Sequence, residues 1–485
     1  MQELPSTVRL AHSPIAILGV PFDNITTPET LELIGEMIAS GQPHYGVTAN
    51  VDFIVQALED VELRRILFDA HLVMADGMPI VWASKKLGNP LPERVTGSGM
   101  IPHLLKLAEQ KDWKVFFLGG TERSVATAAE KTRAKHPRLQ LVGAYSPPFK
   151  PLLEMDHAGI LRRIREAKPD ILLVAFGCPK QEKWINMSFR EAGVPFVVGV
   201  GATIDFLAGT FKRAPVWMQK SGTEWIFRML QEPKRMVGRY GKGLRVFTIA
   251  IMRQWWQLRS RNTARPAAGE VETSQSDDPV VSAPSRIDAL AADAISGKLR
   301  RAVESGHVML DMARTDFVDS TGFGLLIRLR KHARELGHQF FLITPRPSVV
   351  AALRLMKLDE FFSIQSSIAG ARLLIERMAR TSVVNSAVAG SDLQIQWVGE
   401  VTASTAIELG ARTESELAQL SPGMTIAIDL RRVTFMDSAG IGLMLRFKKS
   451  LKRRDVNLTF LNPAQSVRTV LRFTKLEEYL LGETK

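Results

Sequence analysis

Apolar and polar positions alternate in blocks over the first 210 residues, where short apolar runs are separated by helical stretches. The runs are apolar on both faces and are followed by Gly, Pro or Asp, which is typical of strands buried on both sides of a sheet. The pattern therefore predicts a mostly parallel sheet with crossover helices. The predicted strands are 14–19, 44–49, 71–75, 114–119, 170–176 and 195–200.

Polar or glycine-rich segments stand at the ends of these strands. Because parallel strands bring their carboxyl ends to one edge of a sheet, we expect these segments to line a common crevice. Each alone has a simpler explanation, since Asp-Gly is usually a turn, Asn at a helix start is usually a cap and Gly-Gly is usually a tight connection. The segments are Thr48-Ala49-Asn50, Asp76-Gly77, Glu93–Gly97, Gly119-Gly120, Pro179–Glu182 and Gly199–Asp205.

The second half of the chain is an internal repeat at a constant offset of 118 residues. The Asp-Ser pair at 319–320 aligns with the pair at 437–438, and the match runs without a gap over about fifty residues. Each copy has the pattern of a strand, an Asp-Ser turn, a helix, a strand and a second helix. An earlier first strand is recognisable in the second copy, but not before Arg286 in the first.

The pattern divides the chain into three domains and two linkers. Residues 263–285 are poor in large apolar side chains and rich in Ser, Pro, Ala and acidic residues, which is typical of a linker. The predicted boundaries are a first domain at 1–262, a linker at 263–285, a small α/β module at 286–380, a linker at 381–391 and a second module at 392–485.

The net charge of +13 is concentrated at the end of the first domain. Residues 212–261 contain twelve Lys and Arg against two Glu, with aromatic residues between them. Such a segment attracts polyanions, and the aromatic rings favour an anionic membrane surface. The simpler alternative is a solvated helical face. No motif supports nucleic-acid binding, so we expect no nucleic-acid partner.

Cysteine content and hydropathy bear on the compartment. Cys178 is the single cysteine, which excludes a disulfide within the chain and indicates a reducing compartment. The first residues lack the apolar stretch of a secretory signal, and no run reaches the roughly 20 apolar residues of a membrane helix. We therefore expect a cytoplasmic protein that associates peripherally with the inner face of the cytoplasmic membrane.

Several common catalytic motifs are missing from the sequence. It has no P-loop, no His-Glu-x-x-His, no Gly-x-Ser-x-Gly and no paired-Cys metal pattern. It also lacks the Asp-x-Asp pair with which many sugar-nucleotide enzymes hold Mg²⁺. If the first domain binds a nucleotide sugar, cationic side chains and helix N-termini must offset the diphosphate charge. We expect no metal and no cofactor.

The motifs T-A-N, A-D-G, E-R-V-T-G, F-L-G-G, G-x-P-K-Q-E, G-V-G-A-x-x-D-F-x-A-G, R-A-P-x-W and E-W-x-x-R-x-x-x-E-P-x-R occur in this order. Together they resemble the WecG/TagA/CpsF glycosyltransferase family over nearly all of residues 10–240. The resemblance implies a Rossmann-like α/β domain that transfers a sugar, with inversion and without a metal, from a UDP-sugar to a saccharide on a polyprenyl diphosphate. Such enzymes serve cell-surface polysaccharide or exopolysaccharide biosynthesis.

The same resemblance assigns roles to the strand-end residues. Asp76 is the candidate general base, with Thr48 beside it, because an inverting transfer needs a carboxylate to take the acceptor hydroxyl's proton. Positive charge is needed where UDP departs, and the bidentate fork of Arg suits that task. The Gly119-Gly120 loop would let a phosphate or ribose approach the backbone. The implied pocket residues are Asn50, Gln181, Glu182 and Asp205, and the implied diphosphate ligands are Arg94, Arg228, Arg235 and Arg239.

The two repeats resemble STAS domains, the fold of anti-sigma factor antagonists. F-V-D-S-T-G-F-G and F-M-D-S-A-G-I-G match the D-S-x-G-x-G turn of that family. The resemblance implies that Ser320, or the adjacent Thr321, and Ser438 are candidates for phosphorylation by a partner kinase. Unphosphorylated docking is the alternative, because Asp-Ser before a helix is also a good cap.

The leading hypothesis is a UDP-sugar-dependent hexosyltransferase that the STAS-like domains regulate or localise. The alternative is a phospho-regulated STAS interaction protein whose transferase domain serves as a scaffold. The sequence does not distinguish the transferred sugar, the acceptor glycan or the oligomeric state.

Overall fold

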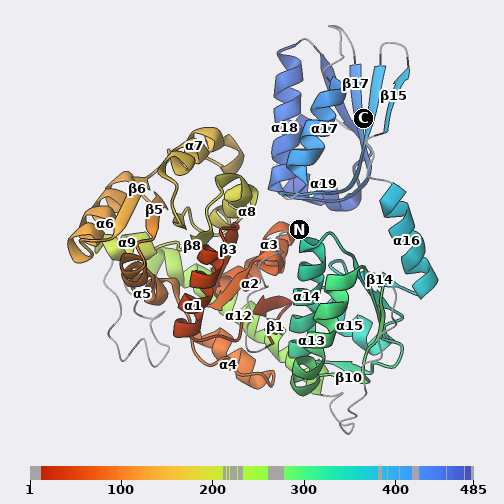
Figure 1. The fold of residues 1–485 in the computed structure, drawn as a ribbon, viewed down its shortest axis with the longest axis horizontal. Helices are drawn as coiled ribbons and strands as arrows, with labels where there is room; N and C mark the ends of the chain where they lie inside the picture. Colours follow the sequence, from red (N-terminus) through yellow and green to blue (C-terminus); the bar gives the residue numbers. More distant parts are fainter. Residues whose placement is uncertain are drawn as a thin grey trace. The chain divides into compact units, whose positions relative to one another are not determined.

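The computed structural model describes most of the chain (Figure 1). The described residues are 13–210, 215, 218, 227, 233–259, 278–380, 385–389, 392–403, 405–417, 425–454, 456–474 and 476–481. The chain divides into two compact units. The larger consists of Met1–Phe149, Asp156–Ile185 and Phe189–Ile375, and the smaller of Lys150–Met155, Asn186–Ser188 and Glu376–Lys485.

A six-stranded parallel sheet organises the first domain, which confirms the predicted α/β class. Its spatial order is β4-β3-β8-β7-β5-β6. The neighbours β3 and β8 therefore have their connections on opposite sides, because β3 is followed by β4 on one side and β8 is preceded by β7 on the other. Such a reversal opens a crevice at the carboxyl ends of the strands. The strands are β3 (His44–Ala49), β4 (Leu72–Ala75), β5 (Lys114–Gly119), β6 (Gln140–Tyr145), β7 (Ile171–Ala175) and β8 (Phe196–Gly199).

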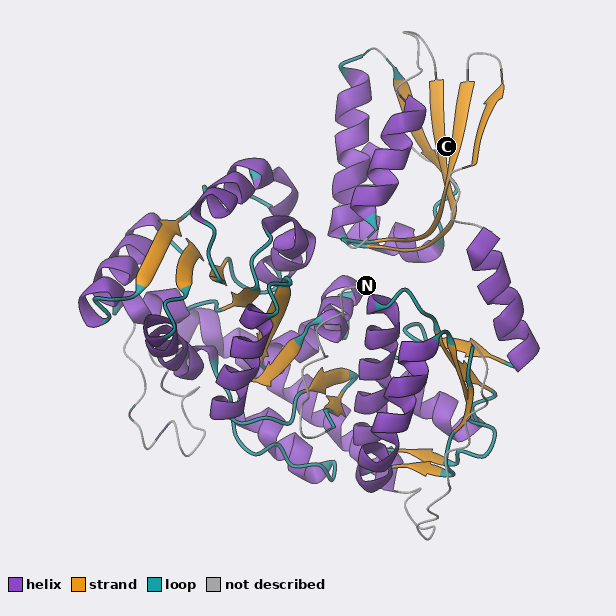
Figure 2. Ribbon diagram, in the orientation of Figure 1, coloured by secondary structure: helices purple, strands orange, loops and turns teal. Residues whose placement is uncertain are grey.

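Helices cover this sheet and bury its apolar faces (Figure 2). Leu33 and Ile34 of α1 and Leu104 and Leu105 of α5 pack in one core with Phe117 of the sheet. The helix starts carry capping residues such as Thr26, which forms a reciprocal capping box with Glu29. The helices are α1 (Thr27–Ala39), α2 (Val51–Ala57), α3 (Val61–Asp69), α4 (Met78–Lys86), α5 (Gly97–Gln110), α6 (Glu122–Lys135), η1 (Leu152–Glu154), α7 (His157–Ala167), α8 (Lys180–Ala192) and α9 (Thr203–Ala208).

The predicted strand at 14–19 does not join the parallel sheet. It forms an antiparallel hairpin of β1 (Ile15–Ile17) and β2 (Val20–Phe22). The two turn residues, Leu18 and Gly19, both have positive φ, at 50° and 88°. A two-residue turn of this kind reverses the chain and matches the twist of the paired strands, so the run ends after three residues.

The long helix α12 (Pro233–Arg259) spans much of the basic segment. Phe247, Ile251 and Gln254 of this helix are buried, whereas Met252 and Trp256 are 48% and 69% exposed. Among the described residues, no helix is long and apolar enough to cross a membrane.

The first repeat forms a small α/β domain in the same compact unit as the transferase domain. Its sheet has the order β14-β13-β11-β9, all parallel, with a separate parallel pair of β10 and β12. The elements are β9 (Val280–Ser282), β10 (Arg286–Ile287), α13 (Ala289–Ser305), β11 (Val308–Asp311), β12 (Phe317–Val318), α14 (Ser320–Glu335), β13 (Phe340–Ile343), α15 (Pro347–Leu355), β14 (Ser363–Gln365) and α16 (Ile368–Arg380).

The second repeat forms the bulk of the smaller unit. Its sheet has the order β15-β16-β17-β18, with β15 antiparallel, and α17 and α18 lie together on one side of it (Figure 2). The elements are β15 (Asn385–Ala389), β16 (Asp392–Val401), α17 (Ala406–Leu417), β17 (Thr425–Met436), α18 (Ser438–Lys452), β18 (Asn457–Leu461), α19 (Gln465–Phe473) and α20 (Glu477–Leu481).

Two predicted linkers contain strands. β9 lies within the segment 263–285 and pairs with β11, so the first repeat does have a strand before Arg286. β15 lies within 381–391 and pairs with β16. Both strands are short and at a sheet edge, where few large apolar side chains are needed, so composition alone did not reveal them.

Candidate functional site

Three of the predicted segments meet at the carboxyl end of the sheet. Thr48, near the end of β3, is buried and donates from Oγ1 to the Gly199 carbonyl at the end of β8, at 3.3 Å. A Cβ placed on Gly97 would lie 3.6 Å from Thr48 Oγ1 and 3.3 Å from Thr203 Oγ1. The T-A-N, E-R-V-T-G and G-V-G-A motifs are therefore in contact with one another.

Asp76 stands directly after β4, the strand next to β3. Its backbone N–H donates to the Ala49 carbonyl at 2.9 Å, which brings Asp76 beside the T-A-N segment. Its side chain is neither buried nor fully exposed. Asp76 and Thr48 therefore lie at the ends of adjacent strands, and Asp76 is partly exposed. The role of Asp76 as general base stays a prediction.

Arg94 lies in a loop that is fixed on both sides. Glu93 Oε1 accepts a hydrogen bond from the Thr27 N–H, and Thr96 caps α5 by accepting from the Gly99 N–H at 2.9 Å. Arg94 itself is half-buried. Its role toward a diphosphate stays a prediction.

Asn50 acts as the N-cap of α2. Its Oδ1 accepts from the backbone N–H groups of Asp52 and Phe53 at 2.9 and 3.3 Å. The simpler explanation for this residue is thus present in the structure, and its part in a sugar-nucleotide pocket stays a prediction.

Gln181 links two of the strand-end loops. It is 2% exposed, and its Oε1 accepts from the N–H groups of Gly177 and Gly201 at 3.3 and 3.2 Å. A Cβ on Gly199 would lie 2.7 Å from Gln181 Nε2, so a larger residue there would displace this side chain. Gln181 therefore joins the loop after β7 to the loop after β8 at the carboxyl end of the sheet.

Glu182, next to Gln181, is also 2% exposed. It accepts a hydrogen bond from Gln181 Nε2 at 2.5 Å. Burial raises the pKa of Glu182 to about 7, although hydrogen bonds from Gln181 and Cys178 act in the opposite direction. Burial also raises the pKa of the neighbouring Cys178 thiol. Glu182 and Asp76 thus differ in environment, because Glu182 is buried and Asp76 is partly exposed.

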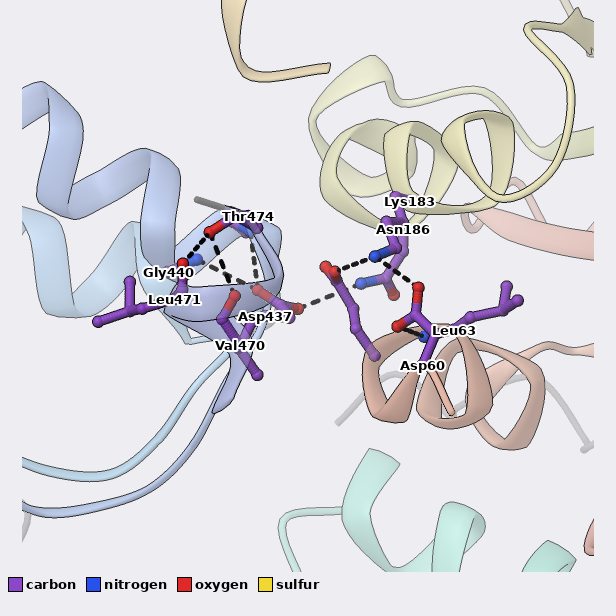
Figure 3. Close-up of polar contacts among 11 residues, drawn as sticks. Asp60, Leu63, Lys183, Asn186, Asp437, Gly440, Val470, Leu471 and Thr474 are labelled. Carbon is purple, nitrogen blue, oxygen red and sulfur yellow. Dashed lines mark hydrogen bonds and ion pairs between the residues drawn. The ribbon is translucent and has the colours of Figure 1, made fainter. Parts of the chain in front are cut away.

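A buried ion cluster supports the same helix (Figure 3). Lys183 Nζ lies 2.8 Å from Asp60 Oδ2 and 2.9 Å from Glu62 Oε2. Burial lowers the pKa of Lys183, but Glu62 and Asp60 outweigh it and raise the pKa above its usual value. The sequence pattern did not predict this cluster, because Lys183 is 121 positions from Glu62 and 123 from Asp60, and no motif connects them.

The Gly119-Gly120 loop requires glycine for steric reasons. Gly119 has φ 101°, and a Cβ there would lie 2.6 Å from the Ala175 carbonyl oxygen. The Gly120 N–H donates to that same carbonyl at 2.9 Å. A Cβ on Gly120 would lie 3.6 Å from Ile204, one residue before the half-buried Asp205. The loop and α9 therefore face one another.

The remaining predicted cations are only partly described. Arg228 lies outside the described residues, and Arg235 and Arg239 belong to the backbone of α12 with side chains that the structure does not describe. Within the described ranges, no three His, Cys, Asp or Glu side chains gather as a metal site would require.

The two Asp-Ser turns have the same geometry. Asp319 Oδ1 accepts from the N–H groups of Thr321 and Gly322, both at 2.8 Å. Asp437 Oδ1 accepts from the N–H groups of Ala439 and Gly440 at 2.8 and 3.1 Å (Figure 3). Burial raises the pKa of Asp319 to about 6, despite the two N–H groups, which lower it.

Both serines that follow are buried, Ser320 completely and Ser438 with 2% of its surface exposed. The Ser320 hydroxyl accepts a hydrogen bond from Gln254 Nε2 at 2.9 Å. A kinase would therefore reach Ser320 only after this contact opens. Phosphorylation of Ser320 and Ser438 stays a prediction.

Comparisons with known proteins agree with this arrangement. The model of the glycosyl transferase WecG/TagA/CpsF family matches residues 15–261, and the STAS domain model matches residues 270–371 and 384–485. Two N-acetylglucosaminyldiphosphoundecaprenol N-acetyl-beta-D-mannosaminyltransferases, from Staphylococcus aureus strains MW2 and NCTC 8325, are each 31% identical over 239 residues. The match covers 49% of this chain and 91% of each relative.

A solved structure of a putative anti-sigma factor antagonist from Thermotoga maritima is similar to part of the chain. It has 20% identity and a TM-score of 0.21, and the match covers 22% of this chain and 94% of the other. The family model spans the whole parallel sheet, the strand-end segments and α12. The chain therefore belongs to the WecG/TagA/CpsF family, and is a glycosyltransferase with two STAS domains behind its transferase domain.

Proposed function

We propose that this enzyme transfers a hexose from a UDP-sugar to a saccharide carried on a polyprenyl diphosphate, with inversion at the transferred carbon. The names of the Staphylococcus aureus relatives support this, because those enzymes move N-acetylmannosamine onto N-acetylglucosaminyl-diphosphoundecaprenol. The observation that carries the proposal is that Asp76 and Thr48 lie close together at the carboxyl ends of the paired strands β4 and β3.

The difference in burial between Asp76 and Glu182 supports Asp76 over Glu182 as the base. A general base must come within hydrogen-bonding distance of the hydroxyl that it deprotonates. Asp76 is partly accessible at the strand end, whereas Glu182 is enclosed and hydrogen-bonded to Gln181. In this proposal Asp76 takes the acceptor proton as the hydroxyl oxygen attacks C1 of the sugar, and the bond from C1 to UDP breaks.

The charge of the departing UDP is balanced by arginine in this proposal. Arg94 stands in the fixed loop before α5, three residues before Gly97, which lies against Thr48. Arg228, Arg235 and Arg239 are proposed to supply further positive charge to the two diphosphates.

The exposed face of α12 supports a location on the inner surface of the cytoplasmic membrane. Ile249, Met252 and Trp256 are exposed large apolar side chains, and Arg245 and Arg253 are exposed beside them. A helix with this combination binds at the interface of an anionic bilayer. The polyprenyl acceptor would be held in the same plane.

The test is a UDP-release assay with the full-length protein and a polyprenyl-diphosphate-linked N-acetylglucosamine acceptor in detergent or vesicles. UDP-N-acetylmannosamine is the first donor, followed by UDP-glucose and a UDP-linked uronic acid. Acceptor-dependent UDP release with one donor supports the proposal. Absence of turnover with every donor, in a folded preparation that binds vesicles, contradicts it.

A further inference from the structure

One face of α14 in the first STAS domain is bound to the transferase domain by three cationic residues. Arg328 lies 2.6 Å from Asp23, and Arg334 lies 2.7 Å from Asp69. Between them, Lys331 Nζ donates to the Ala70 carbonyl at 2.8 Å. The three cations are three residues apart in sequence, so they share one side of the helix.

Close backbone approach and apolar packing accompany these polar contacts. A Cβ on Gly324 of α14 would lie 2.2 Å from the Pro14 carbonyl oxygen, and one on Gly19 would lie 2.5 Å from that of Met356. Phe68 of the transferase domain packs edge to face on Phe361, with ring centroids 4.5 Å apart. Ala16 and Phe68 belong to the hydrophobic core of the first STAS domain. The hairpin, α3 and the first STAS domain thus share one hydrophobic core.

The contacts of α14 converge on the segment that leads into β4. Asp69 and Ala70 lie three and two residues before Leu72, where that strand begins, and Asp23 is hydrogen-bonded to Val73 within it. Asp23 is 8% exposed, its Oδ2 accepts from the Val73 N–H at 2.7 Å, and its own N–H donates to the Val73 carbonyl at 3.0 Å. Asp76 follows Val73 by three residues.

We propose that the first STAS domain positions the catalytic side of the transferase domain. In this proposal the Arg328–Asp23 ion pair holds β4 in place and thereby fixes the location of Asp76. This inference rests on the proposed role of Asp76 as the base. The Asp23 carboxylate joins the two domains, since one of its oxygens binds Arg328 and the other binds Val73. Loss of the Arg328 cation removes the ion-pair partner of the buried Asp23 carboxylate, so we expect the segment from Asp23 to β4 to be held less firmly.

The second STAS domain supplies a matched control. Arg446 aligns with Arg328 at the repeat offset, and it is exposed, with its guanidinium 6.0 Å from the Phe447 ring centre. The same substitution at the two positions therefore removes the same chemical group from the same place in the repeat. Arg328, in contrast to the exposed Arg446, forms an ion pair with Asp23 of the transferase domain.

The experiment compares Arg328→Ala, Arg328→Lys and Arg446→Ala in the full-length protein by hydrogen exchange and by steady-state kinetics. Positioning predicts faster exchange in peptides covering 69–78 for Arg328→Ala. It also predicts a fall in kcat on the order of tenfold to a hundredfold with little change in the donor KM. Arg328→Lys keeps the charge but not the planar fork, so its rate should lie between those of wild type and Arg328→Ala. Arg446→Ala should match wild type in both measurements.

Exchange and kcat that are unchanged in a folded Arg328→Ala variant would overturn the inference. A drop in kcat that equals a drop in the folded fraction at the assay temperature would also overturn it, because it would show a general loss of stability. Absence of UDP release by the wild type bears on the proposed function alone, since the exchange measurement tests the link between Arg328 and β4 without any turnover.

Discussion

The Gln254 side-chain amide and the Ser320 hydroxyl are hydrogen-bonded at 2.9 Å, which joins α12 to the start of α14. Gln254 is fully buried, and its Nε2 also donates to the Ala16 carbonyl at 3.0 Å while its Oε1 accepts from the Leu18 N–H at 2.9 Å. The Gln254 side chain thus links α12 both to the β1–β2 hairpin and to the first STAS domain. The serine predicted as a phosphorylation site is a structural residue of an internal interface.

A negative charge at Ser320 is expected to open this interface. Ser320→Ala removes only a hydrogen-bond acceptor and should cost about 1 kcal/mol of unfolding free energy. Ser320→Glu buries an unpaired carboxylate and should cost about 3 kcal/mol or more. Urea denaturation of the full-length protein measures both, with the exposed Ser450→Glu as control. Equal stability of the Ala and Glu variants would contradict the role of Ser320 at the interface.

Removal of the Asp76 carboxylate is expected to slow the transfer without preventing donor binding. Asp76→Asn keeps the size of the side chain but cannot accept the acceptor proton, so kcat should fall at least about a hundredfold. The measurement is initial-rate kinetics of UDP release. Asp112→Asn is the control, because Asp112 is exposed and its positive φ of 56° suits Asn as well as Asp. A near wild-type rate would remove Asp76 from the role of base.

Burial of Glu182 predicts a pH-dependent stability difference between wild type and Glu182→Gln. The folded-state pKa of about 7 lies above the usual value of 4.5, so the folded protein holds this proton more tightly than the unfolded chain does. Wild type should therefore lose stability relative to the variant as pH rises from about 4.5 to about 7, by roughly 3 kcal/mol at 1.36 kcal/mol per pKa unit. Below pH 4.5 the two proteins should show a constant difference.

Chemical denaturation of wild type and Glu182→Gln at pH 4.5, 6 and 8 measures this difference. Glu191→Gln is the control, because Glu191 is at the surface in an exposed ion pair with Arg165. A difference between wild type and Glu182→Gln that is flat over the whole range would show that Glu182 ionises at its ordinary pKa.

Loss of Lys183 is expected to be far more costly than loss of a surface cation. Lys183→Met leaves Asp60 and Glu62 buried and uncompensated, which should cost about 3 to 5 kcal/mol. Arg165→Met breaks the exposed pair with Glu191 and should cost less than about 1 kcal/mol. Thermal unfolding of the two variants makes the comparison. Adding Asp60→Asn and Glu62→Gln to Lys183→Met should recover much of the loss, and no recovery would argue against the charge explanation.

The exposed face of α12 is expected to bind anionic vesicles. Trp256→Ser removes a 69% exposed aromatic side chain and should weaken binding on the order of tenfold, since about 1.4 kcal/mol of apolar contact is lost. Sedimentation with phosphatidylglycerol vesicles measures the affinity. Leu290→Ser is the control, because Leu290 is 85% exposed on α13, outside this helix. If Trp256→Ser and Leu290→Ser bound the vesicles with equal affinity, this face of α12 would be excluded as the membrane-binding surface.

Much of the fold follows from the sequence pattern alone. Runs such as Val115–Leu118 and Phe196–Gly199 are apolar on both faces, and a strand of that kind is stable only between two helical layers. The repeat at 118 residues predicted two similar α/β modules, because equal patterns bury equal faces. Asp76 and Thr48 could be predicted as neighbours, since parallel strands end at the same sheet edge.

The tertiary structure alone decided what joins the domains. Asp23 and Arg328 are 305 residues apart, and neither stands in a motif, so no local pattern connects them. Asp60, Glu62 and Lys183 became an ion cluster, and Ser320 became an interface residue, only after packing excluded water from them. Local patterns report which face of an element is apolar, whereas the pairing of buried polar groups depends on which distant elements meet. Which distant elements pack together depends on the shape and charge of their whole surfaces, and a local sequence pattern does not report these.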